Sequence, residues 1–299
     1  MKRSSERFLT THTGSLPRPA DLIQMMFARE EGVPVDPAAL AARVRAAVDE
    51  IVRKQVEAGL DVVNDGEMSK PSYATYIKDR LHGFGGESHP LVYQDLAEFP
   101  ELARRVFGDP GRSRRKTPAC NGPVGVRDPR AAQADAEVVS AALARAKAAE
   151  GFLSAASPGV ISLFFRDDHY HDHEKYLMAI AEAMRHEYET IARAGVILQI
   201  DCPDLAMGRH IQYARLGLEE FRKAALRLSS RWRGRRCPSW PRPWGPSCRN
   251  RRHTHIVRTG GSPPRWPGFR CLSAHRTAGA PRRMPRSCSW RSWHSPYSH

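Results

Sequence analysis

A short apolar run that ends in acidic residues occurs twice along the chain. Residues 196–200 form one run and precede Asp201, and residues 60–63 form the other and precede the Asp-Gly-Glu segment 65–67. In both copies an amphipathic helical pattern comes first and ends at a glycine. Nearly continuous hydrophobicity over so short a run is typical of strands that are buried on both faces of a parallel sheet. The repeated order of helix, glycine, strand and acid predicts an α/β protein with its chemistry at the strand ends.

The pattern extends over about five strand–helix units. The predicted strands begin at residues 8, 60, 119, 159 and 196. Helices are predicted over residues 36–58, 135–149 and 173–194, and another begins near residue 218. Residues 70–100 are rich in aromatic and loop-forming residues, and we expect an insertion that covers a substrate. An eight-unit barrel would need three more units, but the periodic pattern ends after about residue 228.

The positive charge is concentrated in the last quarter of the chain. The 299 residues carry a formal net charge of +15, yet residues 227–299 hold 17 Arg and no Lys, Asp or Glu. Residues 1–226 therefore carry a net charge of −2. We accordingly divide the chain into a partial barrel, residues 1–226, which carries the chemistry, and an irregular basic tail, residues 227–299.

The composition of this tail is unusual. It contains all six Trp, four of the six Cys and 10 of the 23 Pro. Disordered segments are normally poor in Trp and Cys, so we interpret the tail as a coding sequence translated out of frame. The alternative is a genuine basic tail that binds nucleic acid, with Arg on the phosphates and Trp stacked on the bases. That alternative predicts a steep salt dependence of binding that disappears when residues 227–299 are deleted.

The rest of the chain indicates a cytoplasmic protein with small-molecule partners. Residues 1–9 lack the apolar core of a signal peptide, and no stretch approaches the roughly 20 apolar residues of a membrane span. Cys120 and Cys202 both lie in strand-like contexts, which favours reduced thiols over a disulfide framework. We therefore expect neither a membrane nor a specific nucleic-acid partner.

Polar side chains at the predicted strand ends are the candidate binding groups. Gly14 and Ser15 follow the first strand, Glu67 follows the second and Asp201 follows the last. Main-chain N–H groups and a hydroxyl suit a small polar ligand, whereas a carboxylate can hold an ammonium group or act as a base. A solvent-exposed turn remains the alternative for the glycine–serine pair and for Glu67.

A histidine-rich segment follows the fourth predicted strand. His169, His171 and His173 alternate with Tyr170 and Asp172. Such a cluster could bind a divalent metal. Alternate spacing does not by itself place three nitrogens on one ion, so we favour a polar loop in which Asp172 caps the next helix.

Four motifs stand in a fixed order within about residues 8–226. They are Thr11-His12-Thr13-Gly14-Ser15-Leu16-Pro17-Arg18-Pro19, Asp65-Gly66-Glu67, Ser157-Pro158-Gly159-Val160-Ile161 and Gln199-Ile200-Asp201-Cys202-Pro203-Asp204. Together they resemble the cobalamin-independent methionine synthase family, in the catalytic, carboxy-terminal type barrel of its short single-barrel subgroup. The resemblance implies a (β/α)8 TIM barrel, which would be incomplete here.

The resemblance also implies an activity and a set of site residues. Members of the family transfer a methyl group from methyltetrahydrofolate to homocysteine, whose thiol is activated by zinc, in methionine biosynthesis. By resemblance, Thr13, Gly14 and Ser15 would contact the homocysteine carboxylate, and Glu67 and Asp201 would hold its ammonium group. Cys120, Phe164 and Phe165 would lie toward the folate.

The resemblance breaks down where the zinc ligands are expected. In the family they are a His-x-Cys pair, an acid and a distant Cys, whereas residues 227–299 contain neither a His-x-Cys nor an acid. We therefore assign no metal ligand and expect impaired activity, because the thiol depends on the metal to become an attacking thiolate. The alternative enzyme is a related zinc-dependent alkyl transferase that uses another thiol, such as one that opens epoxides.

Overall fold

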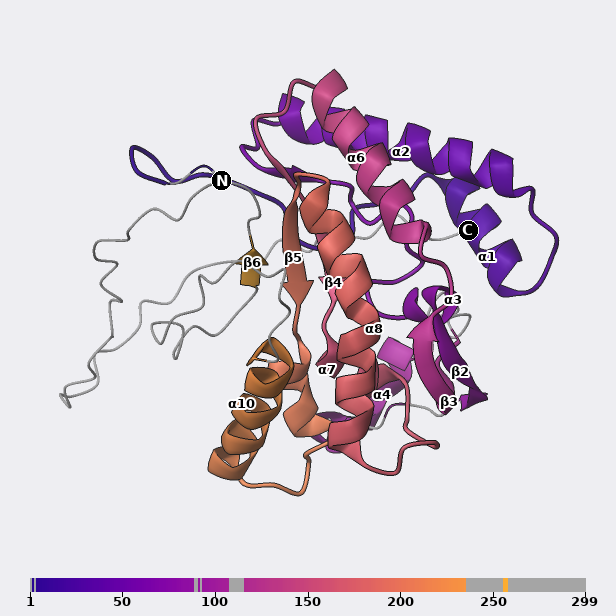
Figure 1. Cartoon of the computed structure of the whole chain (residues 1–299), viewed down its shortest axis with the longest axis vertical. Coiled ribbons are helices and arrows are strands. Elements are labelled where there is room, and N and C mark those ends of the chain that lie inside the picture. The colour runs from indigo at the N-terminus through magenta and orange to yellow at the C-terminus, as the bar shows by residue number, and fades with distance from the viewer. Residues whose placement is uncertain are drawn as a thin grey trace. The chain divides into compact units, whose positions relative to one another are not determined.

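The sheet at the centre of the protein joins strands that are far apart in the sequence. In the computed structural model, which describes residues 2, 4–88, 91, 93–107, 116–234 and 255–257, four strands pair in the order β1-β4-β5-β6. Strands β1 (Val63–Asn64), β4 (Gly151–Ala156) and β5 (Ile197–Asp201) are parallel, and β6 (His255–Val257) runs antiparallel to β5 (Figure 1). These residues all belong to a unit that spans Met1–Gly261. The predicted α/β class with a parallel sheet is confirmed.

The long helices form because each carries an apolar stripe and a good cap. Helix α2 (Pro37–Glu57) begins after Asp36, whose side chain accepts a hydrogen bond from Ala38 N at 2.9 Å, and it has proline at its first position. Helix α8 (His173–Arg193) begins after Asp172, which accepts hydrogen bonds from two main-chain N–H groups. Helix α6 (Ala131–Arg145) packs against both α2 and α8, so the three form one layer beside the sheet (Figure 1).

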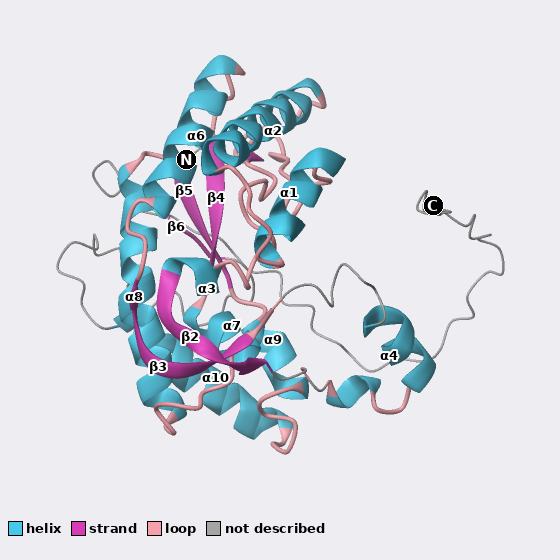
Figure 2. Cartoon of the chain, turned by 90° about the vertical axis from the view of Figure 1, so that its right-hand side faces the viewer, coloured by secondary structure: helices cyan, strands magenta, loops and turns pink. Residues whose placement is uncertain are grey.

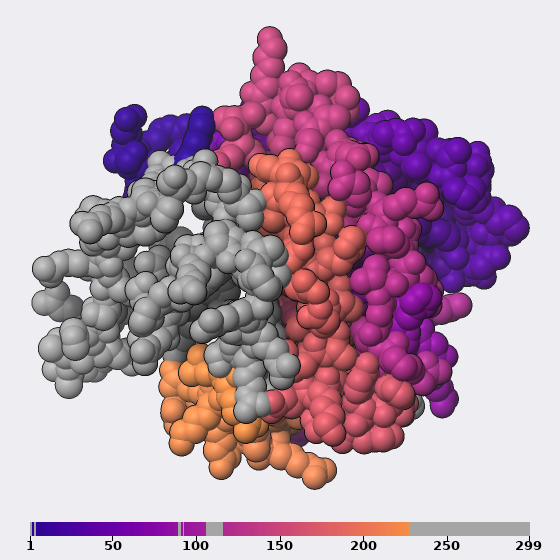
Figure 3. Space-filling view, viewed as in Figure 1, coloured from indigo at the N-terminus to yellow at the C-terminus, as the bar shows by residue number. Residues whose placement is uncertain are grey.

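The remaining helices lie at the margins of this layer. Helix α1 (Ala20–Glu30) packs on α2, and α10 (Leu218–Gly234) packs on α8. In Figure 3 the purple atoms of the first helices lie at the upper right, and the orange atoms near the start of α10 lie at the lower edge. Short helices α9 (Asp204–Met207) and η2 (Gly208–His210) follow β5. No helix within the described ranges is both long and apolar enough to span a membrane.

The third predicted strand is real but belongs to a different sheet. Strand β3 (Pro118–Val126) pairs antiparallel with β2 (Leu81–Ser88) in a separate curved hairpin (Figure 2). The segment expected to be a loop-rich insertion, residues 70–100, also holds α3 (Ile77–Arg80) and η1 (Gln94–Leu96), and α4 (Pro100–Phe107) begins where it ends. An apolar run interrupted by glycines at 122 and 125 fits an antiparallel strand pair as well as a barrel strand, so the sequence could not separate the two.

The fourth predicted strand, residues 159–165, is wrong. These residues lie in helix α7 (Pro158–Phe164), which begins after Ser157, whose Oγ accepts a hydrogen bond from Val160 N at 3.0 Å. Six of its seven residues are buried, so no polar face marks the helical period. The true strand, β4, precedes it and is buried throughout.

The five-unit count is therefore not confirmed by the described residues. The first predicted strand contributes a single parallel bridge, Thr11 to Val62. Helix α10 runs past the expected boundary at residue 226, and β6 is antiparallel, whereas barrel strands are parallel. Most of the predicted tail lies outside the described residues.

Candidate functional site

Three of the predicted site residues converge although they are far apart in the sequence. Ser15 Oγ donates a hydrogen bond to Glu67 Oε2 at 2.5 Å. Asp201, at the end of β5, is close enough to Glu67 that the negative charge of Glu67 helps to raise its pKa; burial is the larger cause. Glu67 is 3% exposed, whereas Ser15 and Thr13 are exposed. Glu67 and the partly buried Asp201 are therefore less exposed than the hydroxyl groups of Ser15 and Thr13.

The end of β1 is fixed by a buried glutamine on α2. Gln55 Nε2 donates to Asn64 O at 2.7 Å, and its Oε1 accepts from Asn64 N at 3.1 Å. Asn64 Nδ2 in turn donates to His12 O at 2.7 Å, and its Oδ1 accepts from Gly66 N at 2.7 Å. This chain of hydrogen bonds holds the segment around His12 and the turn around Gly66 in one place.

The glycine between the two acids is required by both conformation and space. Gly66 has φ +62°, and an added Cβ would lie 3.0 Å from Met68 Cε and 3.2 Å from Leu16 Cβ. Leu16 N also donates to Gly66 O at 3.1 Å, which joins the Ser15 loop to this turn. The close approach of the two loops is what brings Ser15 to Glu67.

The end of β5 is fixed by the residues next to it. Gln199 Nε2 donates to Asp201 Oδ1 at 2.8 Å and to Ser154 Oγ at 3.2 Å. Ser157 Oγ donates to Asp204 Oδ1 at 2.7 Å, and a Cβ on Gly159 would lie 2.0 Å from Asp204 Oδ2. The start of α7 thus packs directly against the segment that follows Asp201.

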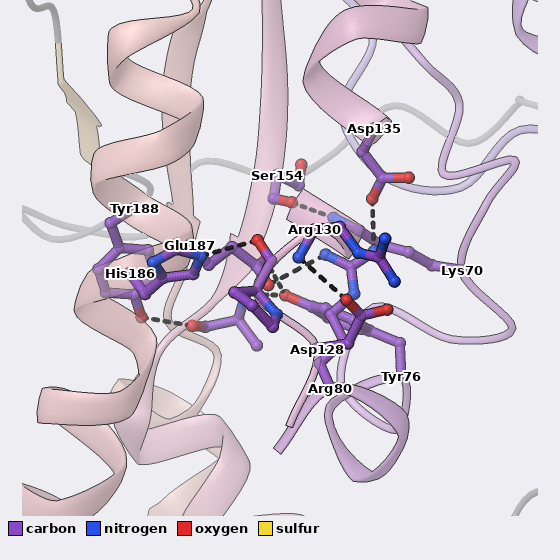
Figure 4. Close-up of polar contacts among 12 residues, drawn as sticks. Lys70, Tyr76, Arg80, Asp128, Arg130, Asp135, Ser154, His186, Glu187 and Tyr188 are labelled. Atoms are coloured by element: carbon purple, nitrogen blue, oxygen red, sulfur yellow. Dashed lines mark hydrogen bonds and ion pairs between the residues drawn. The ribbon is translucent and has the colours of Figure 1, made fainter. Parts of the chain in front are cut away.

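A buried polar network (Figure 4) joins the site through Lys70, whose main-chain N–H donates to Glu67 O, and through Ser154, which accepts from Gln199. Lys70 Nζ donates to Ser154 O and lies 4.7 Å from the centre of the Tyr76 ring. Tyr76 Oη donates to Glu187 Oε1 at 2.6 Å and accepts from Ala156 N at 3.2 Å. Arg80 pairs with Glu187 at 3.0 Å and with Asp135. Charges buried this deeply are tolerated because each has a partner.

Aromatic side chains lie beside the acids. Burial raises the pKa of Tyr73 to about 12, and Tyr93, Asp201 and Glu67 add to the effect. Tyr73 meets Phe164 edge to face, with 6.0 Å between the ring centres. Sequence reasoning noted the aromatic residues of this segment but did not assign Tyr73, Lys70 or Gln199 to the site.

The three residues predicted on the folate side are not equivalent. Phe164 contacts Tyr73, and therefore lies near the acids. Phe165 and Cys120 are fully buried, and the ring of Phe165 packs against that of Phe84 in β2, tilted by 43° with 4.8 Å between the ring centres. Burial raises the pKa of Cys120 to about 11, so its thiol is protonated at neutral pH. Their role toward a folate stays a prediction.

Of the residues predicted to contact the carboxylate of the ligand, Gly14 has φ +100°, and its carbonyl oxygen lies 3.0 Å from His12 Nε2. The hydrogen bonds described here do not engage the side chain of Thr13. The predicted contacts of Thr13 and Gly14 with a ligand remain untested.

The histidine-rich segment forms the polar loop that we favoured. Asp172 caps α8, with its Oδ1 3.0 Å from Glu174 N. His173 Nε2 lies 3.0 Å from Tyr213 Oη, and burial lowers the pKa of this histidine. Throughout the part of the chain that the structure describes, no three His, Cys, Asp or Glu side chains are grouped so that they could hold a metal ion.

Known proteins match the part of the chain that contains these site residues. The family model described as "Cobalamin-independent synthase, Catalytic domain" matches residues 8–226. A protein of Coxiella burnetii (strain RSA 331 / Henzerling II) named 5-methyltetrahydropteroyltriglutamate–homocysteine methyltransferase is 27% identical over 199 residues, 66% of this chain. A B12-independent methionine synthase from Shewanella sp. W3-18-1, solved in complex with selenomethionine, has a TM-score of 0.52 at 20% identity and covers 74% of this chain.

These relatives are longer than the segment that they share with this protein. The aligned part is 23% of the Coxiella protein and 57% of the Shewanella chain. The structural similarity establishes a shared fold, and the family match over 8–226 takes in well over half of the 299 residues. The resemblance inferred from the four motifs is thereby confirmed, and the chain belongs to the cobalamin-independent synthase family, through the catalytic domain of that family.

Proposed function

We propose that this protein derives from a methyltransferase of methionine biosynthesis and that its site binds homocysteine. The activity would be that of the 5-methyltetrahydropteroyltriglutamate–homocysteine type named for the Coxiella relative. The Shewanella relative was solved with selenomethionine, an amino acid of the same class as the expected product. The substrates would be small molecules, homocysteine and a methylated folate.

One observation carries this proposal: the carboxylate of Glu67, which is hydrogen-bonded to Ser15, lies close enough to that of Asp201 for the two charges to interact. Homocysteine is a zwitterion, so its binding needs hydrogen-bond donors for the carboxylate and negative charge for the ammonium group. The main-chain N–H groups of Thr13, Gly14 and Ser15 would supply the donors, because the hydroxyl hydrogen of Ser15 is already donated to Glu67. Glu67 and Asp201 would supply the negative charge, and an ammonium group between them would relieve the repulsion that raises the pKa of Asp201.

The family uses zinc to activate the thiol, but the residues at this site do not fit such an ion. Within the described ranges no group of three metal-binding side chains occurs, and the groups that meet here are two carboxylates and a hydroxyl. The sequence of residues 227–299 also lacks an acid and a His-x-Cys. We therefore derive no step through zinc, and we propose that the chain binds the amino acid but transfers methyl groups poorly.

Binding and methyl transfer are tested separately on the full chain, the first by calorimetry and the second by the formation of methionine. We expect L-homocysteine to bind, and Glu67→Gln to weaken binding roughly tenfold or more by removing a charge-assisted contact. A sulfonate-bearing thiol should bind worse, because it offers no ammonium group; the reverse preference would favour the alternative alkyl transferase. Rapid methionine formation from methyltetrahydropteroyltriglutamate would contradict the expected impairment, and failure of homocysteine to bind would refute the proposed site.

A further inference from the structure

Glu67 has a main-chain conformation that few residues other than glycine adopt. Its φ is 59°, in the left-handed region, and the residue is almost fully buried. A side chain in this region must be held by its neighbours, because an extended or right-handed conformation is otherwise preferred. In this conformation the carboxylate of Glu67 faces Ser15, and its Oε2 lies 2.5 Å from Ser15 Oγ.

Arg18 holds the turn that begins at Glu67. One nitrogen of its guanidinium, Nη2, donates to Glu67 O at 2.8 Å and to Lys70 O at 2.6 Å. Lys70 N also donates to Glu67 O, at 3.1 Å, and closes the turn. Arg18 comes from the loop that carries Ser15, so one side chain fixes both ends of the turn relative to that loop.

Asp65 holds the same residue from the other side. Its Oδ1 accepts a hydrogen bond from Glu67 N at 3.0 Å, and its carboxylate is buried. The main-chain N–H and carbonyl of Glu67 are therefore both bound by side chains, those of Asp65 and Arg18. The acidic side chain of Glu67 is left to face Ser15.

We propose that Arg18 and Asp65 are positioning residues for ligand binding: by bonding the main chain of Glu67, they keep its carboxylate directed at the place where the ammonium group of the ligand binds. This inference rests on the proposed function, because it assumes that Glu67 meets an ammonium group. It predicts that loss of either residue lowers the preference for ligands that carry this group, rather than lowering the affinity for every ligand.

The test compares L-homocysteine with 4-mercaptobutanoate, which lacks only the amino group. The measured quantity is the dissociation constant of 4-mercaptobutanoate divided by that of L-homocysteine, obtained by calorimetry on the full chain. A larger ratio means a stronger preference for homocysteine. Arg18→Met should reduce this ratio roughly tenfold, since a misdirected carboxylate loses a charge-assisted contact. Arg43→Met is the matched control, because Arg43 is also partly buried but pairs with Asp21 between α1 and α2. It should leave the ratio unchanged.

A pair of substitutions at Asp65 provides an independent arm, which also serves if Arg18→Met does not fold. Asp65→Asn and Asp65→Ala both remove the charge, but only asparagine keeps an oxygen that can accept from Glu67 N. We expect Asp65→Asn to retain several times more of the preference for homocysteine than Asp65→Ala.

The outcomes separate this inference from the proposed function. If the unaltered chain shows no preference for homocysteine, both fail. If it prefers homocysteine and the preference survives Arg18→Met, or falls equally in the two Asp65 variants, the positioning role is refuted and the proposed function stands.

Discussion

A methyl group added at Gly66 tests the close packing of the two loops that bring Ser15 to Glu67. Gly66 and Gly59 both have positive φ, +62° and +81°. Alanine in this region costs about 1–2 kcal/mol at either position. At Gly59 nothing lies within 4 Å of the added Cβ, whereas at Gly66 the contacts are 3.0 Å to Met68 Cε, 3.2 Å to Leu16 Cβ and 3.3 Å to Ile51 Cγ1.

The crowding at Gly66 should add a further cost of about 1–3 kcal/mol, as is usual for overpacked interiors. We therefore expect Gly66→Ala to lower the free energy of unfolding by about 2–5 kcal/mol and Gly59→Ala by about 1–2 kcal/mol. The loss of freedom in the unfolded chain is the same for both substitutions and cancels in their difference.

Urea unfolding of both variants measures this difference, provided that the slope of free energy against denaturant is unchanged. Equal destabilisation by the two substitutions would show that the loops do not press on Gly66, and the reasoning about their close approach would be refuted. Because Gly66 precedes Glu67, Gly66→Ala should also weaken homocysteine binding, whereas Gly59→Ala should not.

Three further predictions follow from buried groups. Burial raises the pKa of Asp65 from 3.8 to about 6, so between these pH values the folded chain binds more protons than the unfolded chain and loses stability as the pH rises. Asp65→Asn should flatten this loss of stability when urea unfolding is measured across the same pH range. An unchanged pH profile would contradict the prediction. Ser157→Ala removes the cap of α7 and the hydrogen bond to Asp204, and should lower the free energy of unfolding by about 1–3 kcal/mol in the same assay. Alanine in place of an exposed serine that makes no such bonds should have little effect. Tyr76→Phe should cost about 1–3 kcal/mol, because Ala156 N is left buried without its partner; a neutral effect would argue against the network.

The sequence predicted α2 and α8 well because their signals are local, whereas the predicted helix over residues 135–149 lies four residues too late relative to α6. Asp36 and Asp172 are standard caps, and glycines mark the ends of α2 and α8, so α2 and α8 begin and end within one or two residues of the predicted positions. Strand β5 was equally clear, since its apolar run stops at an acid.

Segments without a polar face were harder to predict. Helix α7 is buried almost throughout, so its apolar residues show no period that separates a helix from a strand. The capping role of Ser157 and the proline after it were the available signals for a helix. The pairing of β3 with β2 depends on contacts between distant residues, which no local pattern specifies.

The residues of the candidate site also fall into those that a local sequence pattern indicated and those that it did not. Ser15, Glu67 and Asp201 could be predicted because each follows an apolar run. Lys70, Tyr76 and Arg80 could not, since their importance arises from partners such as Ser154 and Glu187 that are more than 80 residues away.

The hydrogen bonds described above that orient Ser15, Glu67 and Asp201 are made among residues that precede position 205. The family's metal ligands, by contrast, would come from later parts of the chain. Under the proposed function, recognition of the amino acid and chemistry at its sulfur would thus be encoded in separate stretches of sequence. A mutation that rewrites the end of such a gene can remove catalysis while it leaves behind a receptor for the substrate.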